Sequence, residues 1–401
     1  MSNKPEKRGL VPRLRFPEFR EAGEWDEKPL GDFLTESRIP GSKGDIAKKL
    51  TVKLWGNGVF AKSETTQGSV NTQYFRRKAG QFIYSKLDFL NQAFGVIPVS
   101  LDNYESTVDL PCFDFSEGID SGFLLEYVKR KGFYERNGEE ADGSRKAKRI
   151  QVEAFLSFPI LVPELVEQQK IADCLASLDD LITLEGQKLE TLKTHRIALM
   201  QQLFPAEGET LPKLRFPEFR DAGEWKTRSV SQLAKVTTGA KDTQNKADGG
   251  RYPFFVRSQT VERIDSYSYD GEAILTSGDG VGVGKNFHYI RGKFDFHQRV
   301  YCIYGFDETI SGMFFYLYFS EHFGCRVMRM SAKNSVDSVR MAMITEMPVI
   351  LPSIEEQERI ADCLASLDDL IIAQTQHLAV LRTQKKGLMQ QLFPLLDEVS
   401  A

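Results

Sequence analysis

The sequence is poor in the residues and patterns that most metalloproteins, disulfide-linked proteins and membrane proteins require. It has 5 cysteines and 5 histidines in 401 residues, with no C-x-x-C pair and no histidine spacing typical of a metal site. An odd number of cysteines without such a pair fits a reducing compartment better than a disulfide framework. No run approaches about 18 apolar residues, and the first residues contain no apolar signal region. We therefore expect a cytoplasmic protein without a membrane span or signal peptide.

Nucleotide-binding and methyltransferase patterns are also missing. The stretch SGDGVGVGKN at residues 277–286 fails as a P-loop, because Asp279 replaces the first glycine and Asn286 stands where Ser or Thr should follow Lys285. Val283 likewise interrupts a G-x-G-x-x-G pattern. The chain has no NPPY-like or F-x-G-x-G pattern, which argues against a self-sufficient methyltransferase. We interpret residues 277–286 as a glycine-rich turn after a strand.

Length and charge set further limits. A chain of 401 residues is long for a single hydrophobic core, so two or more domains are expected. A hydrophobic content of 41% and a charged content of 27% are typical of a soluble globular protein. The net charge of −4 means that any binding of a polyanion must come from local basic patches or from partners.

What the sequence does contain is a large internal repeat. PRLRFPEFREAGEW at residues 12–25 returns as PKLRFPEFRDAGEW at residues 212–225. EQQKIADCLASLDDLI at residues 167–182 returns as EQERIADCLASLDDLI at residues 356–371. The offsets are 200 and 189 positions, and the two middles between these segments share no similarity that can be aligned by eye. The repeat is too long for a solenoid unit and predicts a duplicated plan with two different middles.

Each closing segment of the repeat is predicted to be a long helix with a heptad stripe. The first lies between Pro163 and Pro205 and the second between Pro352 and Pro394. Apolar residues that recur at alternating steps of three and four form the seam of a coiled coil. The seam residues are Ile171, Leu175, Leu178, Ile182, Leu189, Leu192, Leu199 and Leu203 in the first helix and Ile360, Leu364, Leu367, Ile371, Leu378, Leu381, Leu388 and Leu392 in the second. We expect the two helices to pair with each other, antiparallel, at an offset that the sequence leaves open.

Polar residues on these helices repeat as well, although heptads do not require it. The repeated polar positions are Asp173, Ser177, Asp179 and Asp180 in the first helix and Asp362, Ser366, Asp368 and Asp369 in the second. A recent duplication would also explain this identity, but it would have preserved residues 183–197, which differ from residues 372–386. We therefore favour a surface that binds the same partner twice, about a pseudo-two-fold axis.

The chain resembles the specificity subunits of type I restriction-modification systems. The likeness rests on the RFPEF…GEW segments, on FPILVPELVEQQKIADCL and MPVILPSIEEQERIADCL at the starts of the helices, and on the two-half layout from Pro12 to Pro394. It implies that each middle is a target-recognition domain that reads one half of a bipartite site in double-stranded DNA. It also implies that the helical rod sets the spacer and docks two modification subunits, which methylate adenine.

The resemblance further implies that this chain is not an enzyme and has no cofactor or metal of its own. S-adenosylmethionine, ATP and magnesium would belong to the partner subunits. Separate restriction (motor) subunits would join through the assembled complex and cut DNA. Whether such a subunit is present here, which bases are read and how long the spacer is are not fixed by the sequence.

Candidate DNA-contacting residues lie in the two middles. Residues 128–150 carry eight Lys or Arg against four acids, whereas residues 164–208 carry four against eight. Basic residues suit phosphate contacts, and Asn, Gln and Arg can read bases in the major groove. The candidates are Arg76, Arg77, Lys78, Lys86, Asn91, Gln92, Arg145, Lys146, Lys148 and Arg149 in the first middle and Lys285, Asn286, His288, Lys333 and Asn334 in the second. Because the two sets differ, the site is expected to be asymmetric.

The fold class expected is mixed α/β, with two target-recognition domains separated by two long helices. We place the first domain at residues 1–163, the central helix at 164–205, the second domain at 206–352, and the C-terminal helix with its tail at 353–401. Alternating strand-like runs and turns in both middles support the α/β assignment. The rival interpretation is a coiled-coil scaffold whose two domains bind proteins and no nucleic acid.

Overall fold

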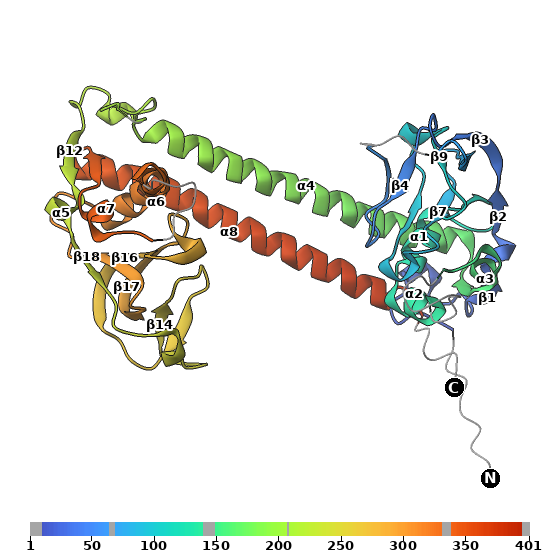
Figure 1. The fold of residues 1–401 in the computed structure, drawn as a ribbon. Coiled ribbons are helices and arrows are strands. Elements are labelled where there is room, and N and C mark those ends of the chain that lie inside the picture. The colour runs from blue at the N-terminus through green and yellow to red at the C-terminus, as the bar shows by residue number, and fades with distance from the viewer. Residues whose placement is uncertain (1–9, 64–68, 139–148, 207, 331–337, 395–401) are drawn as a thin grey trace, which may run out of the picture. The chain divides into compact units, whose positions relative to one another are not determined.

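The computed structural model of the protein describes residues 10–63, 69–138, 149–206, 208–330 and 338–394. It divides into two units, of which unit 1 comprises residues 1–186 and 376–401 and unit 2 comprises residues 187–375. The border between them crosses both long helices, α4 (Leu165–Leu203) and α8 (Ile354–Gln391), which are labelled in Figure 1. Each unit therefore contains one globular domain and part of each long helix.

The globular domain of unit 1 is closed by a two-stranded antiparallel sheet, in which Asp26 lies opposite Val162. These closing strands are β1 (Asp26–Pro29) and β11 (Pro159–Val162). Between them the chain forms a four-stranded sheet in the order β2-β10-β7-β8, from β2 (Leu34–Ser37), β10 (Cys112–Phe115), β7 (Phe82–Tyr84) and β8 (Phe94–Val96). Smaller sheets are formed by β3 (Ile39–Lys43), β6 (Gln73–Arg76) and β9 (Glu105–Ser106), and by β4 (Leu50–Val52) and β5 (Val59–Ala61). The helices are α1 (Ser121–Val128), α2 (Lys131–Gly138) and α3 (Val152–Ser157).

Unit 2 repeats the closing sheet but not the domain inside it. The closing strands are β12 (Lys226–Ser229) and β19 (Pro348–Leu351), again antiparallel. Inside lies a six-stranded sheet in the order β13-β18-β16-β17-β14-β15. Its strands are β13 (Lys235–Thr238), β14 (Tyr252–Phe255), β15 (Glu262–Ile264), β16 (Tyr269–Ser277), β17 (Phe287–Phe296) and β18 (Val300–Tyr304). The helices are α5 (Val230–Leu233), α6 (Gly312–Met330) and α7 (Met341–Thr345).

Each domain is built around aromatic side chains, and each core includes the end of a long helix. In unit 1 the ring of Trp25 packs against Phe123 and Phe393, with centroids 5.7 and 6.1 Å away. In unit 2 the ring of Trp225 packs 6.0 Å from Phe314, which in turn contacts Phe204. Burial of such rings is a dominant stabilising term, so the repeated Trp and the repeated LFP segment anchor helix to domain in both units.

The repeated arginine of the RFPEF segment is explained by a buried ion pair. In unit 1 the guanidinium of Arg15 donates to both carboxylate oxygens of Glu167, at 2.8 and 2.7 Å. In unit 2 Arg215 makes the same bidentate contact with Glu356, at 2.7 Å for both bonds. Each arginine also donates to two backbone carbonyls of its own AGE turn. The opening segment of each half is thus fastened to the start of a long helix.

The glutamine of the repeated E-Q pair fastens the same helix start to the domain. The amide nitrogen of Gln168 donates to the carbonyls of Pro163 and Gly118, at 2.9 and 3.0 Å, and its oxygen accepts from the N–H of Asp120 at 2.9 Å. Gln357 makes the corresponding three bonds in unit 2. The E-Q motif therefore encodes a structural junction.

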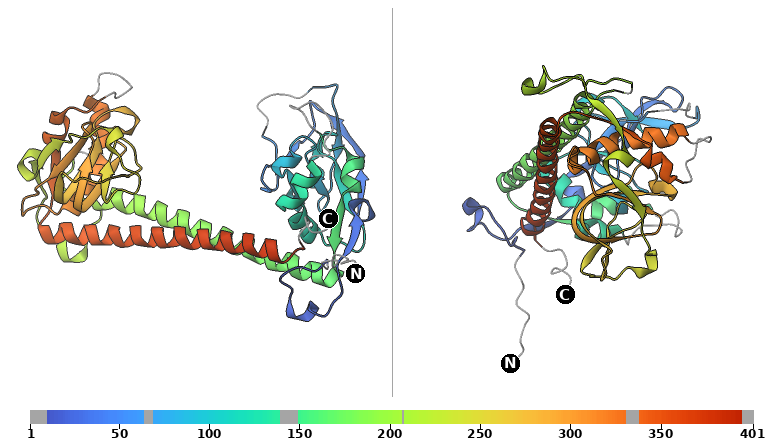
Figure 2. Two further views of the ribbon diagram at one scale, coloured as in Figure 1. Left: turned by 90° about the horizontal axis from the view of Figure 1, so that it is seen from below. Right: turned by 90° about the vertical axis from the view of Figure 1, so that its left-hand side faces the viewer.

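Within each unit the two long helices lie antiparallel (Figures 1 and 2). In unit 1 Asp179 pairs with Lys385 at 2.6 Å, while residues near 171–175 share a core with Leu392 and Phe393. In unit 2 Arg196 pairs with Asp368. All sixteen predicted seam residues are buried or half-buried. The two ion pairs are equivalent in the repeat, and they fix the pairing offset that the heptads left open.

The opening segment meets a helix end in the same way in both units. The N–H of Leu214 donates to the carbonyl of Gln202 at 2.9 Å, where segment and helix are consecutive in the chain. The N–H of Leu14 donates to the carbonyl of Gln391 at 2.9 Å, although these residues lie at opposite ends of the sequence. The opening segment and the long helices of unit 1 therefore follow one another in a circularly permuted order relative to those of unit 2.

Candidate nucleic-acid interface

The first basic cluster of unit 1 lies on and after β6. Arg76 and Lys78 are exposed, but Arg77 is 2% exposed. The guanidinium of Arg77 donates to the hydroxyl of Ser106 at 2.8 Å and to the carbonyl of Ser37 at 2.7 Å, and burial lowers its pKa. The prediction that Arg77 contacts DNA is wrong, because its side chain is used inside the domain to join three segments.

The second cluster of unit 1 supports a neighbouring hairpin. Lys86 donates to the side chain of Gln151 at 3.3 Å, and Asn91 and Gln92 are half-buried. The carbonyls of Asn91 and Gln92 accept from the β4–β5 turn, the first of them from the N–H of Trp55 at 2.7 Å. Trp55 is 60% exposed in a left-handed conformation, with φ of 61°. Sequence reasoning missed this exposed indole because its position depends on the fold of the turn.

The basic candidates at residues 145–149 of unit 1 are largely outside the described residues. Arg145, Lys146 and Lys148 lie there, as do Lys333 and Asn334 of unit 2. Arg149 is described and lies 3.4 Å from the carboxylate of Asp109 on the surface. These DNA contacts remain predictions.

Of the three candidates beside the glycine-rich turn of unit 2, Lys285 is exposed. The amide of Asn286 donates to the carbonyl of Arg257 at 2.9 Å and to the hydroxyl of Ser277 at 3.3 Å, so it holds the turn. His288 is half-buried beside the carbonyl of Ser258, and burial lowers its pKa. A histidine with a lowered pKa is neutral near pH 7, so His288 does not supply a cation for phosphate there.

The repeated polar positions of the long helices fall into two groups. Asp179 and Asp368 are half-buried in the ion pairs described above, which explains why an acid occurs at both. The others are exposed, namely Asp173, Ser177, Asp180, Asp362, Ser366 and Asp369. Leu181 and its repeat counterpart Leu370 lie next to them and are 38% and 56% exposed. Each helix thus presents one acidic and apolar surface, and the chain carries two copies of this surface.

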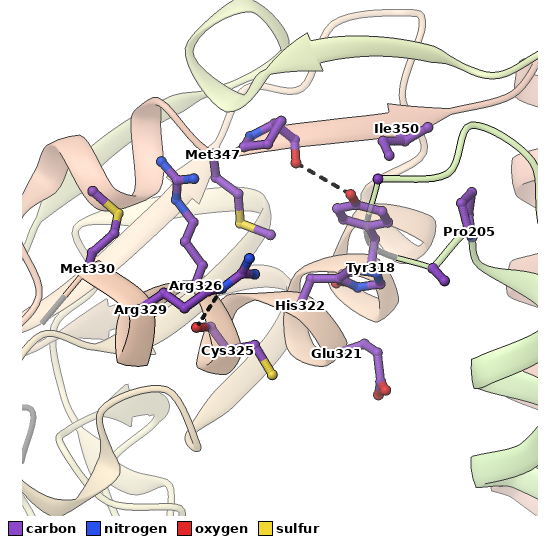
Figure 3. Close-up of a pocket in the computed structure, with 13 residues that line it drawn as sticks. Pro205, Tyr318, Glu321, His322, Cys325, Arg326, Arg329, Met330, Met347 and Ile350 are labelled. Atoms are coloured by element: carbon purple, nitrogen blue, oxygen red, sulfur yellow. Dashed lines mark hydrogen bonds between the residues drawn. The ribbon is translucent and has the colours of Figure 1, made fainter. Parts of the chain in front are cut away.

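A pocket of about 460 Å³ in unit 2 lies between α6 and the chain after α4 (Figure 3). His322 stacks on Tyr318 with centroids 4.2 Å apart, and the Tyr318 hydroxyl donates to the carbonyl of Pro348 at 3.4 Å. At the corresponding place in unit 1, Arg130 stacks over Phe393. The pocket belongs to the junction that anchors a helix end to the domain.

Neither a metal-binding cluster nor a membrane-spanning helix occurs in the described part of the chain. Within the ranges that the structure describes, no group of three or more His, Cys, Asp or Glu side chains could hold a metal ion. Over the same residues, no helix combines the length and apolar character needed to cross a membrane.

A chain that holds two different α/β domains in one repeated helical frame has the build of a bipartite recognition protein. The sequence model of the type I restriction modification DNA specificity domain matches residues 22–194 and again residues 222–382. The chain therefore belongs to this family, and its role lies in DNA sequence specificity.

Relatives and solved structures agree with this family. The EcoDI specificity subunit of Escherichia coli is 32% identical over 38% of this chain and 32% of its own length. The MjaVIII specificity subunit of Methanocaldococcus jannaschii is 22% identical over 94% of this chain and 93% of its own. The crystal structure of the type I S subunit from M. genitalium has the same fold, with a TM-score of 0.63, 13% identity, and coverage of 96% of this chain and 100% of that one.

Proposed function

We propose that this chain is the non-catalytic specificity subunit of a type I restriction-modification complex. Each globular domain reads one half of an asymmetric bipartite site in double-stranded DNA, and the helices set the spacer. The exposed, duplicated surface around Asp180 and Asp369 binds two modification subunits. The chain needs no cofactor or metal of its own, because S-adenosylmethionine, ATP and magnesium are bound by its partners.

The observation that carries this proposal is the contrast between frame and inserted domain. Both units share the closing two-stranded sheet, the Arg–Glu pair and the glutamine junction. Inside this frame, unit 1 has a four-stranded sheet with two smaller sheets, whereas unit 2 has a single six-stranded sheet. A constant frame around different inserts suits common partners and two different DNA sequences.

The decisive experiment replaces residues 226–351 by residues 26–162, so that both units carry the first domain. With the modification subunit present, methylome sequencing should show a site whose two halves are the same sequence in inverted orientation. The reciprocal chimaera, with residues 226–351 in both positions, provides the control and should yield a site built from the other half. Retention of the original asymmetric site by folded, active chimaeras would contradict the assignment of recognition to these domains.

Partner binding is tested on the helix surface. Asp180→Arg together with Asp369→Arg should abolish co-purification of the modification subunit, since both copies of the surface reverse their charge. Glu190→Arg is the matched control, because Glu190 is an exposed acid of α4 that has Ala379 at its repeat position. Equal loss of partner from both variants would show that overall charge, and not this surface, governs assembly.

The non-catalytic role is tested on the purified chain. Calorimetric titration with S-adenosylmethionine should give no binding, and no methyl transfer to DNA should occur until the modification subunit is added. Tight cofactor binding by the chain alone would refute this part of the proposal.

A further inference from the structure

Two exposed arginines of unit 2 share one carboxylate. Nη1 of Arg257 lies 3.1 Å from Oδ1 of Asp279, and Nε of Arg299 lies 3.8 Å from Oδ2 of the same residue. The arginine side chains are 49% and 66% exposed, whereas that of Asp279 is 24% exposed. Asp279 occupies the position of the first glycine in a P-loop pattern. The glycine-rich turn therefore carries an acid between two cations, where a nucleotide-binding loop would have a glycine.

The sheet brings these three residues together from separate loops. Asp279 follows β16, whose last residue, Ser277, lies opposite Val300 at the start of β18. Arg299 belongs to the turn that leads into β18, and Arg257 follows β14, whose end runs parallel to the end of β17. Their convergence therefore results from strand pairing between elements far apart in the sequence.

Glycines allow the turn to pack closely against the backbone of both arginines. The N–H of Gly278 donates to the carbonyl of Arg299 at 2.8 Å, and a Cβ at Gly278 would lie 2.8 Å from that oxygen. A Cβ at Gly282 would lie 2.8 Å from the carbonyl of Arg257 and 2.2 Å from the amide nitrogen of Asn286, which donates to that carbonyl. Both guanidinium groups are therefore presented from fixed main-chain positions.

A buried histidine completes the support under Arg299. His297 is 3% exposed, and its Nδ1 accepts a hydrogen bond from the N–H of Arg299 at 2.9 Å. Burial lowers the pKa of His297, and the arginines nearby act in the same direction against Asp242 and Asp279. The ring is consequently neutral near pH 7 and leaves the positive charge of this face to the arginines.

We propose that Arg257 and Arg299 read guanine in the half-site of the second domain, and that Asp279 is the positioning residue, which accepts a hydrogen bond from Arg257 and forms an ion pair with Arg299. An arginine held in plane by a carboxylate can donate two parallel bonds to O6 and N7 of guanine in the major groove. The exposed polar residues beside them, among them Gln259, Thr260 and Gln298, suit a wetted DNA interface. This inference rests on the proposed function and adds the base class and the residues that read it.

Phosphate binding is the competing role for an exposed arginine, and it makes a different prediction. A lost phosphate contact weakens binding to all sequences alike and reduces the slope of log affinity against log salt by about one. A lost base contact weakens binding to the cognate base pair alone and relaxes specificity at that position. Lysine also separates the two roles, because it retains the charge but not the planar pair of donors.

The experiment uses the full chain assembled with its modification subunit and a DNA duplex containing the methylated site. Each G·C pair of the second half-site is replaced in turn by A·T, and the first half-site serves as internal reference. Arg257→Lys and Arg299→Lys should each lower affinity for the intact site about 5- to 150-fold, the range of one bidentate contact. Each variant should then discriminate less at one G·C position and leave the first half-site unchanged.

The matched control is Arg251→Lys. Arg251 is 73% exposed, lies 3.8 Å from Asp265 and precedes β14, whereas Arg257 follows that strand. The Arg251→Lys variant should leave the discrimination between base pairs unchanged at every position of the site. Uniform weakening of all duplexes by the Arg257 and Arg299 variants would assign them to phosphate, and unchanged binding would remove this face from the interface. A wild-type complex without sequence preference would instead refute the proposed function itself.

Asp279→Asn tests the positioning role. Removing one negative charge should raise affinity for unrelated DNA, while both arginines lose the partner that orients them, so discrimination should fall at two G·C positions at once. Wild-type discrimination at both positions would show that Asp279 does not position the arginines.

Discussion

Replacing Arg15 by alanine should destabilise unit 1 and leave unit 2 almost unaffected. The side chains of Arg15 and Glu167 are 7% and 2% exposed, and the guanidinium makes two bonds to the carboxylate. Removal of one partner of a buried ion pair leaves the other charge without compensation, which costs about 3–5 kcal/mol. Two backbone carbonyls of the AGE turn also lose their donor.

The measurement is urea unfolding followed by the fluorescence of a single tryptophan. The chain has 3 tryptophans, so Trp55→Phe with Trp225→Phe leaves Trp25, whose indole is buried in the core of unit 1. With a urea dependence of about 2 kcal/mol per molar, a loss of about 3 kcal/mol lowers the midpoint by about 1–2 M. The corresponding experiment for unit 2 replaces Arg215 by alanine and keeps Trp225 as the single tryptophan.

The control removes both charges. Arg15→Ala with Glu167→Leu should be more stable than Arg15→Ala alone, because no buried carboxylate is left unpaired. A midpoint that Arg15→Ala moves by less than about 0.3 M would refute the reasoning, as would an equal shift reported by Trp225.

Three further predictions concern the helices and the basic tract. One heptad inserted after Glu185 and another after Gln374 should lengthen the spacer by about three base pairs and keep both half-sites, because seven residues rise by ~10 Å; methylome sequencing reports the spacer. Lys385→Asp should destabilise unit 1 in the same urea assay, and adding Asp179→Lys should recover part of the loss, since the pair is restored with reversed charges. Alanine at all four basic positions of residues 145–149 should weaken DNA binding and flatten its salt dependence, and an unchanged slope in a folded variant would remove the tract from the interface.

The sequence was informative wherever a periodic pattern or a repeat was involved. The heptads predicted long helices, and all predicted seam residues are buried or half-buried, with all of them except Leu392 lying within α4 or α8. The polar interruptions of the stripe, Arg196 and Lys385, form ion pairs with Asp368 and Asp179. The sequence could not reveal that partnership, because the helix offset depends on how the stripes interlock.

Inside the domains, single-residue predictions depended on burial, which one sequence does not report. Arg76, Arg77 and Lys78 are three adjacent cations, yet alternation along β6 and the following residues turns Arg77 inward. Asn286 was predicted from its chemistry, but its amide holds a turn. Arg257 and Arg299 carried no signal at all, because only strand pairing places them beside Asp279.

The circular permutation of the framework affects how the chain is made. Unit 2 is continuous and can begin to fold as soon as it leaves the ribosome, but the core of unit 1 includes Leu392 and Phe393. Because the ribosome adds ~5–20 residues per second, roughly 10–40 s pass between the synthesis of the first domain and that of these two residues. During that interval Trp25 and Phe123 lack the ring of Phe393 and form a target for chaperones. A truncated chain would thus present an unfinished first domain for degradation, although its defect lies near the other end of the gene.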